Sequence, residues 1–184
     1  VNPEDYPIAI EKNWNWIGYP VNVDMSIEDA LQNITPKHGD FFKSQENFSQ
    51  YYEGSGWLGA LNVLEPGKGY MYQNTSDGEF TLVYPNAADM NGAKTMKANV
   101  TSANNCWVAD MTKYANNMSV IAVVENEGQE MGRYEVAAFC NGECRGSARP
   151  IYIEALDRYM IFLTVYGEGN ETMTLRYYDL NYSE

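Results

Sequence analysis

Residues that could perform acid–base or nucleophilic chemistry are few in this sequence. The one histidine, His38, has no serine or cysteine beside it, and Gly54-Ser55-Gly56 lacks the Gly-x-Ser-x-Gly spacing of a nucleophile elbow. Paired carboxylates could hydrolyse glycosides, but the sequence alone places no pair of its 25 acidic residues in one cleft. We therefore predict no catalytic residue, and we expect that the chain is not an enzyme.

Three cysteines are present: Cys106, Cys140 and Cys144. They are weak candidates for a metal or redox site, because zinc prefers four N or S ligands and the spacing from Cys140 to Cys144 is not Cys-x-x-Cys. The Asn-Gly pair between them predicts a two-residue hairpin that pairs Cys140 with Glu143 and Cys144 with Phe139, on opposite faces. We expect buried free thiols, leave open one disulfide from Cys106, and predict no metal and no cofactor.

A glycine-lysine pattern at residues 67–69 has the look of a phosphate loop. A P-loop requires Ser or Thr after Gly-Lys, whereas here Gly69 and Tyr70 follow Lys68. Pro66-Gly67 at the centre of a type II turn accounts for the same residues. We therefore expect a turn that leads into a strand at Tyr70.

Aromatic side chains are the best candidates for ligand binding. Trp14 and Trp16 are two residues apart and would share one face of a strand, and three further candidates are Trp57, Tyr70 and Tyr72. Such rings can stack on sugars or fill a pocket of a protein partner, although each alone would also suit a core. Burial of Trp57 and Leu64 would indicate a scaffold, and exposure of Trp57 or Tyr72 would indicate a binding platform.

The first half of the chain must position most of these rings. We predict two strands around a Glu-Lys-Asn turn within residues 7–23. A second pair of strands is predicted at 40–45 and 48–52, with a short helix over 44–52 as an alternative. An amphipathic helix is expected from the N-cap Ser26 through Ile34, ended by Pro36. Asp77-Gly78 predicts a hairpin between residues 70–74 and 79–84.

The second half alternates apolar and polar residues more regularly. Strands are predicted at 118–124, 134–140, 143–147, 159–166 and 172–179, and the almost wholly apolar run 159–166 should be the central one. The fold class is therefore mainly β. We expect an α+β module at 1–90, a linker at 91–104 and an antiparallel β-sandwich, Ig-like or jelly-roll-like, at 105–184.

Composition excludes some partners and leaves others. The formal net charge is −13 and the basic residues do not cluster, so repulsion opposes binding to nucleic acid. No apolar run approaches the roughly 20 residues needed to span a bilayer. We expect no nucleic-acid partner and no membrane insertion of this chain, with a glycan or a protein as the candidate partner.

Several strings resemble a two-module region of exported and surface proteins of Bacteroidetes and related gut bacteria. The first module is carried by Asn13-Trp-Asn-Trp-Ile-Gly-Tyr-Pro and Leu64-Glu-Pro-Gly-Lys-Gly-Tyr-Met, and the second by Glu143-Cys-Arg-Gly and Phe162-Leu-Thr-Val-Tyr-Gly, among others. The resemblance implies an extracytoplasmic location, at the cell surface or secreted, and a modular parent protein. We expect a non-enzymatic binding or adhesion region, a carbohydrate-binding accessory module of a larger secreted enzyme, or a structural spacer.

Overall fold

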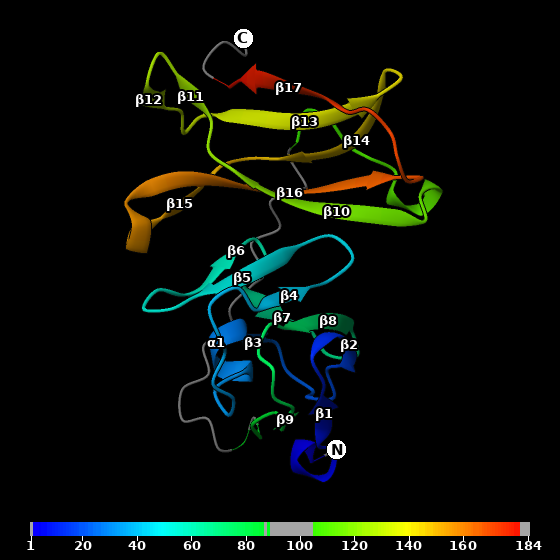
Figure 1. Cartoon of the computed structure of the whole chain (residues 1–184), viewed down its shortest axis with the longest axis vertical. Helices are drawn as coiled ribbons and strands as arrows, with labels where there is room; N and C mark the ends of the chain where they lie inside the picture. Colours follow the sequence, from blue (N-terminus) through cyan, green and yellow to red (C-terminus); the bar gives the residue numbers. More distant parts are fainter. Residues whose placement is uncertain (1, 87, 89–104, 181–184) are drawn as a thin grey trace. The chain divides into compact units, whose positions relative to one another are not determined.

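The computed structural model describes residues 2–86, 88 and 105–180 (Figure 1). The fold is mainly β, as predicted, with several antiparallel sheets. Among the described residues it has one α-helix. The chain divides into two compact units, Val1–Asn99 and Val100–Glu184, which we call unit 1 and unit 2. The predicted linker at 91–104 lies outside the described residues.

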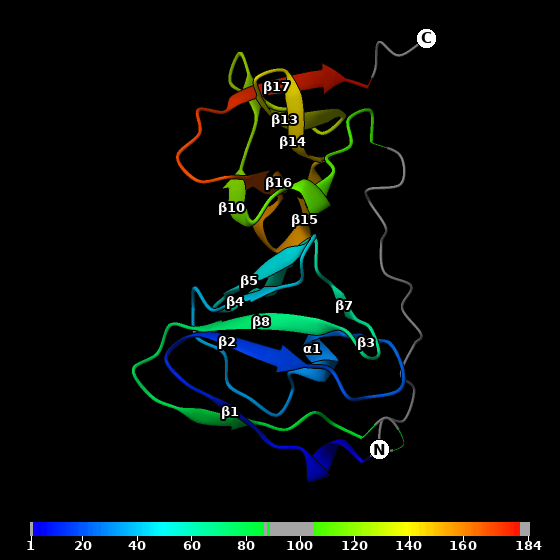
Figure 2. The same cartoon turned by 90° about the vertical axis from the view of Figure 1, so that its right-hand side faces the viewer.

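Unit 1 is built on a five-stranded antiparallel sheet in the order β2-β8-β4-β5-β6, with β2 at one edge beside β8 (Figure 2). The strands from Phe48 onward exclude the helix considered for 44–52. The strand bounds in this sheet are β2 Asn13–Gly18, β4 Phe41–Lys43, β5 Phe48–Tyr52, β6 Gly56–Gly59 and β8 Gly69–Asn74. Two-stranded sheets pair β1 (Ile8–Ile10) with β9 (Phe80–Leu82) and β3 (Met25–Ser26) with β7 (Val63–Leu64).

The two hairpins predicted around Lys12 and Asp77 are wrong. Strand β1 pairs with β9 and β2 pairs with β8, so the two turns are matching corners of one bent antiparallel ribbon. The Asn74 side chain fixes the second corner, since its Nδ2 donates to the Gly78 carbonyl at 2.8 Å and its Oδ1 accepts from the Ser76 amide at 3.0 Å. A 2.7 Å ion pair between Lys12 and Asp77 joins the two corners.

The predicted helix is present but much shorter than expected. Helix α1 spans Ile27–Ala30, and the Ser26 hydroxyl accepts from the Asp29 amide at 3.0 Å, as expected for the N-cap. After Ala30 the chain continues in turns, in which the Ile34 amide donates to the Leu31 carbonyl at 3.1 Å, and the Asn33 side chain donates to the Val83 carbonyl at 3.0 Å. A single turn of helix has little stability of its own, so contacts with the rest of unit 1 must stabilise it.

The Pro66-Gly67 turn is confirmed. Gly67 has φ of +72°, and the Lys68 amide donates to the Glu65 carbonyl at 3.3 Å, which is the geometry of a type II turn. Strand β8 begins at the next residue, Gly69, and brings Tyr70 into the sheet.

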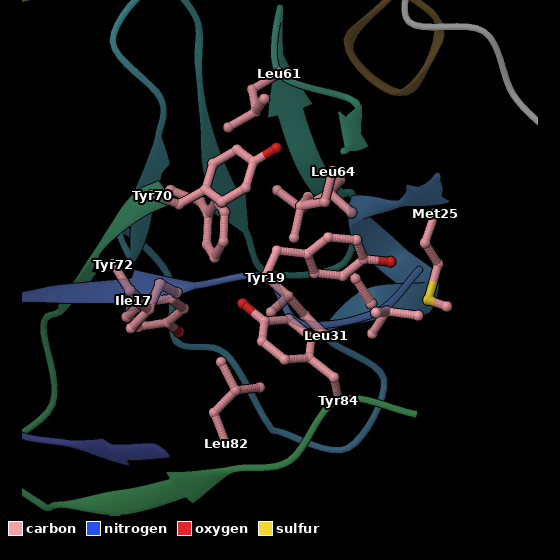
Figure 3. Packing of buried hydrophobic residues seen from close by; sticks show 14 of the residues in the cluster. Ile17, Tyr19, Met25, Leu31, Leu61, Leu64, Tyr70, Tyr72, Leu82 and Tyr84 are labelled. Atoms are coloured by element: carbon pink, nitrogen blue, oxygen red, sulfur yellow. The ribbon is translucent and has the colours of Figure 1, made fainter. Parts of the chain in front are cut away.

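The core of unit 1 is unusually rich in tyrosine. Tyr19 and Tyr84 meet edge to face with ring centroids 5.1 Å apart, and Tyr70 and Tyr72 pack beneath β8 (Figure 3). Trp57 and Leu64 are 8% and 0% exposed, so the stretch that carries them is a scaffold. Packing of these rings against one another stabilises unit 1 beyond the area that they bury.

Unit 2 contains two three-stranded antiparallel sheets in the orders β10-β16-β15 and β14-β13-β17, with a small β11-β12 hairpin. Tyr134, Val136 and Ala138 of β13 form a core cluster with Ile161, Leu163 and Val165 of β16, so the sheets pack in a sandwich-like manner. The bounds are β10 Asn116–Ala122, β11 Glu125–Asn126, β12 Gln129–Glu130, β13 Tyr134–Cys140, β14 Glu143–Ala148, β15 Ile151–Ile153, β16 Arg158–Gly167 and β17 Thr174–Asp179. Short 3-10 helices whose residues are all described span Pro3–Asp5 in unit 1 and Met111–Lys113 and Glu154–Leu156 in unit 2.

Local predictions in unit 2 are confirmed. Asn141 and Gly142 both have positive φ, +51° and +83°, and β13 pairs with β14 through Cys140↔Glu143 and Phe139↔Cys144. The apolar strand β16 lies in the centre of its sheet. At Gly146 of β14 the backbone comes so close to β16 that a Cβ atom would overlap the Thr164 carbonyl oxygen, so only glycine fits there.

Candidate functional site

The cysteines are all free thiols, in line with the expected hairpin register. Cys140 is buried and Cys144 is half-buried, but Cys106 is exposed, contrary to the expectation that all three are buried. Burial and the neighbouring Glu171 carboxylate raise the pKa of the Cys140 thiol. A raised pKa keeps the sulfur protonated at neutral pH, so Cys140 is a poor nucleophile.

The buried acids have structural hydrogen-bond partners. The Asp40 carboxylate accepts from the Tyr72 hydroxyl at 2.5 Å and from the Thr75 amide at 2.9 Å, which fixes the end of β8 against the strand β4. The Glu135 carboxylate accepts from the Trp107 amide at 2.9 Å and thereby attaches the segment before β10 to β13. These bonds explain why both carboxylates can lie in the interior.

Glu171 lies just before β17 and forms a two-pronged ion pair with Arg145, with both N–O distances 3.0 Å. The Glu168 amide and the Arg145 guanidinium both hold the pKa of Glu171 below its usual range. The Arg145 guanidinium also lies 4.2 Å from the ring centre of Tyr114. This cluster fastens the loop before β17 to β14. Within residues 2–86, 88 and 105–180, no three His, Cys, Asp or Glu side chains are grouped closely enough to hold a metal ion.

Three of the five predicted ligand-binding residues are buried. Trp57, Tyr70 and Tyr72 are 8%, 4% and 0% exposed, so the prediction that they contact a ligand is corrected: they belong to the core. Successive side chains of a strand point to opposite faces, so Tyr70 and Tyr72 lie on one face of β8 and Met71 and Gln73 lie on the other.

Trp14 and Trp16 are exposed, in contrast. Their side chains are 43% and 81% exposed, and both lie on the outer face of the edge strand β2, as the alternating pattern predicted. Two residues of a strand span about 6.6–6.8 Å, so the indoles follow one another at about that spacing. The Asn15 side chain, whose Nδ2 donates to the Glu11 carbonyl at 2.8 Å, holds the start of β2 in place.

Register defines the surface around these indoles. Trp14 pairs with Gln73 and Gln73 with Phe41, while Trp16 pairs with Met71 and Met71 with Lys43, so the side chains form two rows across β2, β8 and β4. We call this surface the outer aromatic face. Its six residues are Trp14, Trp16, Phe41, Lys43, Met71 and Gln73. None is acidic, in a chain with 25 acidic residues.

Ring contacts hold the outer aromatic face together. Trp14 and Phe41 meet edge to face with centroids 6.2 Å apart, and Phe41 stacks on Phe48 at 5.0 Å. The Lys43 ammonium lies 6.0 Å from the centre of the Trp14 ring, and burial lowers the pKa of Lys43. The sequence did not identify Phe41, Lys43 and Gln73, because only strand pairing brings them beside the indoles. Trp16 makes no ring contact with another described residue.

Unit 1 also has a groove of about 330 Å³ between residues 33–37 and 74–81, lined by both polar and apolar side chains. Three polar side chains in its lining, Asp40, Asn74 and Ser76, are engaged in the hydrogen bonds that shape the corner between β8 and β9. The groove is therefore largely a consequence of that corner. The fourth tryptophan of the chain, Trp107, is half-buried and packs against Phe139 with ring centroids 5.6 Å apart.

No protein-family model matches the chain, and no curated protein or solved structure shows significant similarity to it. In the part of the chain that the structure describes, no helix combines the length and the apolar character needed to cross a bilayer. Among the described residues, the outer aromatic face is therefore the feature that best indicates a function.

Proposed function

We propose that this chain is a non-catalytic binding region of an extracytoplasmic bacterial protein, and that the outer aromatic face binds a glycan. The observation that carries the proposal is the exposure of Trp14 and Trp16 on one face of a hydrogen-bonded strand. Removal of the large apolar area of an indole from water is favourable. Two adjacent exposed indoles therefore favour the binding of a ligand that covers them.

The composition of the face supports a sugar as the ligand. A pyranose ring presents a flat C–H surface that stacks on an indole, and its hydroxyls require hydrogen-bond donors and acceptors at the rim. Gln73 supplies an amide next to Trp14, and Lys43 supplies a donor in the row of Trp16. The open face and the spacing of the indoles suit consecutive sugar rings of an extended chain better than a single enclosed ring.

The extracytoplasmic part of the proposal is supported by the resemblance of the strings around Trp14 and Gly67 to exported proteins. It also fits the acidic surface, which repels nucleic acid. A carbohydrate-binding accessory module of a larger secreted enzyme would use the same face in the same way.

A glycan array probed with the fluorescently labelled chain and with a Trp14→Ala/Trp16→Ala double variant tests the proposal. We expect the wild type to bind a family of related glycans, and we expect the double variant to lose that signal. Tyr6→Ala is the matched control, because Tyr6 is an exposed aromatic residue, at 55%, outside the face. A wild-type chain that binds no glycan, or a double variant that binds equally well, would refute glycan binding at this face and favour the structural spacer.

A further inference from the structure

A second surface, in unit 2, is distinct from the proposed glycan site. Strand β17 lies beside β13 at the edge of its sheet, and among the described strands it pairs with β13 alone (Figures 1 and 2). Register places Leu175 opposite Ala138 and Tyr177 opposite Val136. Residues directly opposite each other in a sheet share a face, so Leu175 and Tyr177 lie on the core-facing side.

These two side chains are nevertheless largely exposed. Leu175 is 60% and Tyr177 is 63% exposed, whereas their partners Ala138 and Val136 are buried in the core cluster. The opposite sheet shows the same feature at Met118 of β10, which pairs with the buried Val165 and is itself 56% exposed. The sandwich of unit 2 is therefore open along the side of β17, where its core-facing apolar side chains lack a covering layer.

Residues 174–178 of β17 lack the usual features that prevent strand addition. Natural edges are protected by prolines, bulges or charges that point inward. Strand β17 contains no proline, its inward side chains at 175 and 177 are apolar, and an inward charge occurs only at its last residue, Asp179. Its arginine, Arg176, points to the other face, where it lies 4.6 Å from the ring centre of Phe139.

We propose that β17 binds an extended strand of a partner polypeptide, which adds to the edge and covers Leu175 and Tyr177. A strand edge offers backbone donors and acceptors that another backbone satisfies, and the exposed pair at i and i+2 matches a strand with alternating apolar residues. Because the chain carries a net charge of −13, the partner strand should be basic in its remaining positions.

A second copy of this chain fits the edge poorly. Antiparallel pairing of two β17 strands with their core-facing sides aligned requires an even register. Of the two registers with the greatest overlap, one places Arg176 opposite Arg176 at its centre. The other places Tyr177 opposite Tyr177 at its centre and Leu175 opposite Asp179 on both sides. Like charges at the centre of the first register, and an apolar–acid pair on each side of the second, oppose self-association.

The test uses the whole chain and a fluorescein-labelled nine-residue peptide, Lys-Val-Thr-Val-Lys-Ile-Thr-Val-Lys. The negative probe is the same peptide with its second valine replaced by proline. Fluorescence anisotropy measures binding to the wild type, Leu175→Lys, Tyr177→Lys and Thr174→Lys. We expect the first peptide alone to bind, the two inward lysines to weaken binding at least tenfold, and Thr174→Lys, which places the same charge on the same strand but on the outer face, to bind as the wild type does.

Circular dichroism and melting curves show whether each variant folds. If a lysine variant does not fold, the milder substitution Tyr177→Ser replaces it in the binding measurement. Absence of binding to the wild type, or equal binding by all variants, would overturn the proposal. Sedimentation that reveals a wild-type dimer lost in Leu175→Lys would also overturn it, because the occupant would then be a second copy.

Discussion

Replacement of the exposed and buried tryptophans by alanine should separate binding from folding. A tryptophan side chain buries about 150–250 Å² when it is fully enclosed, and each Å² stabilises by about 25 cal/mol. Trp57 is only 8% exposed, so Trp57→Ala should lower the free energy of unfolding of unit 1 by about 3.5–6 kcal/mol. Trp16 is 81% exposed, and the same arithmetic gives an upper limit of about 1 kcal/mol for Trp16→Ala.

Urea-induced unfolding followed by far-UV circular dichroism measures this difference. We expect Trp57→Ala to unfold unit 1 at a much lower urea concentration, and we expect the midpoint of Trp16→Ala to stay close to that of the wild type. Comparable destabilisation by the two variants would show that Trp16 has a structural role, and would remove the reason to regard the outer aromatic face as a binding surface.

Three further predictions concern contacts inside one unit or the other. Gly146→Ala forces a Cβ atom into the Thr164 carbonyl oxygen and should destabilise unit 2 by about 3 kcal/mol in urea unfolding, and an unchanged midpoint would contradict the close approach of β14 to β16. Ser26→Ala removes the N-cap bond of α1 and should cost about 1 kcal/mol, which thermal melting would detect and a Ser26→Thr control should largely retain. The Glu168 amide and Arg145 lower the folded-state pKa of Glu171 below its unfolded value of about 4.3. The stabilisation of the folded state by ionised Glu171 is therefore complete above the unfolded pKa and is lost as the pH falls through the lower folded pKa. Glu171→Gln should therefore reduce stability at pH 7 and flatten the loss of stability towards acid, whereas an unchanged acid profile would contradict this role.

Local turn chemistry was readable from the sequence. Asn141-Gly142 and Pro66-Gly67 require backbone conformations that glycine adopts easily, and the structure has both turns where they were predicted. The apolar strand β16 was equally clear, because a strand covered on both faces needs few polar residues.

Features that depend on distant partners were not predictable. Asp77-Gly78 signals a change of direction but does not specify which strand pairs with which, so a corner was mistaken for a hairpin. The segment after the early end of α1 likewise has a distant partner, because the Asn33 side chain donates to the carbonyl of Val83, 50 residues away in the sequence.

The candidate site was predictable in part for the same reason. Alternation placed Trp14 and Trp16 on one face, and the structure shows that both indoles are exposed. The pattern around Tyr70 and Tyr72 is equally regular, but periodicity alone does not say which face of a strand points to the core. Their burial follows from the packing of that face of the sheet into the core cluster, which also contains Ile10, Ala30 and Leu82.

The most direct test of glycan binding at the outer aromatic face is isothermal titration calorimetry with the strongest glycan from the array. If each stacked indole contributes as much as an aromatic pair, about 0.5–1.5 kcal/mol, Trp16→Ala should raise the Kd about two- to twelvefold and the double variant with Trp14→Ala at least about fivefold. Tyr6→Ala should leave the Kd unchanged. Equal Kd values for the wild type and the double variant would contradict the proposal that Trp14 and Trp16 form the binding surface.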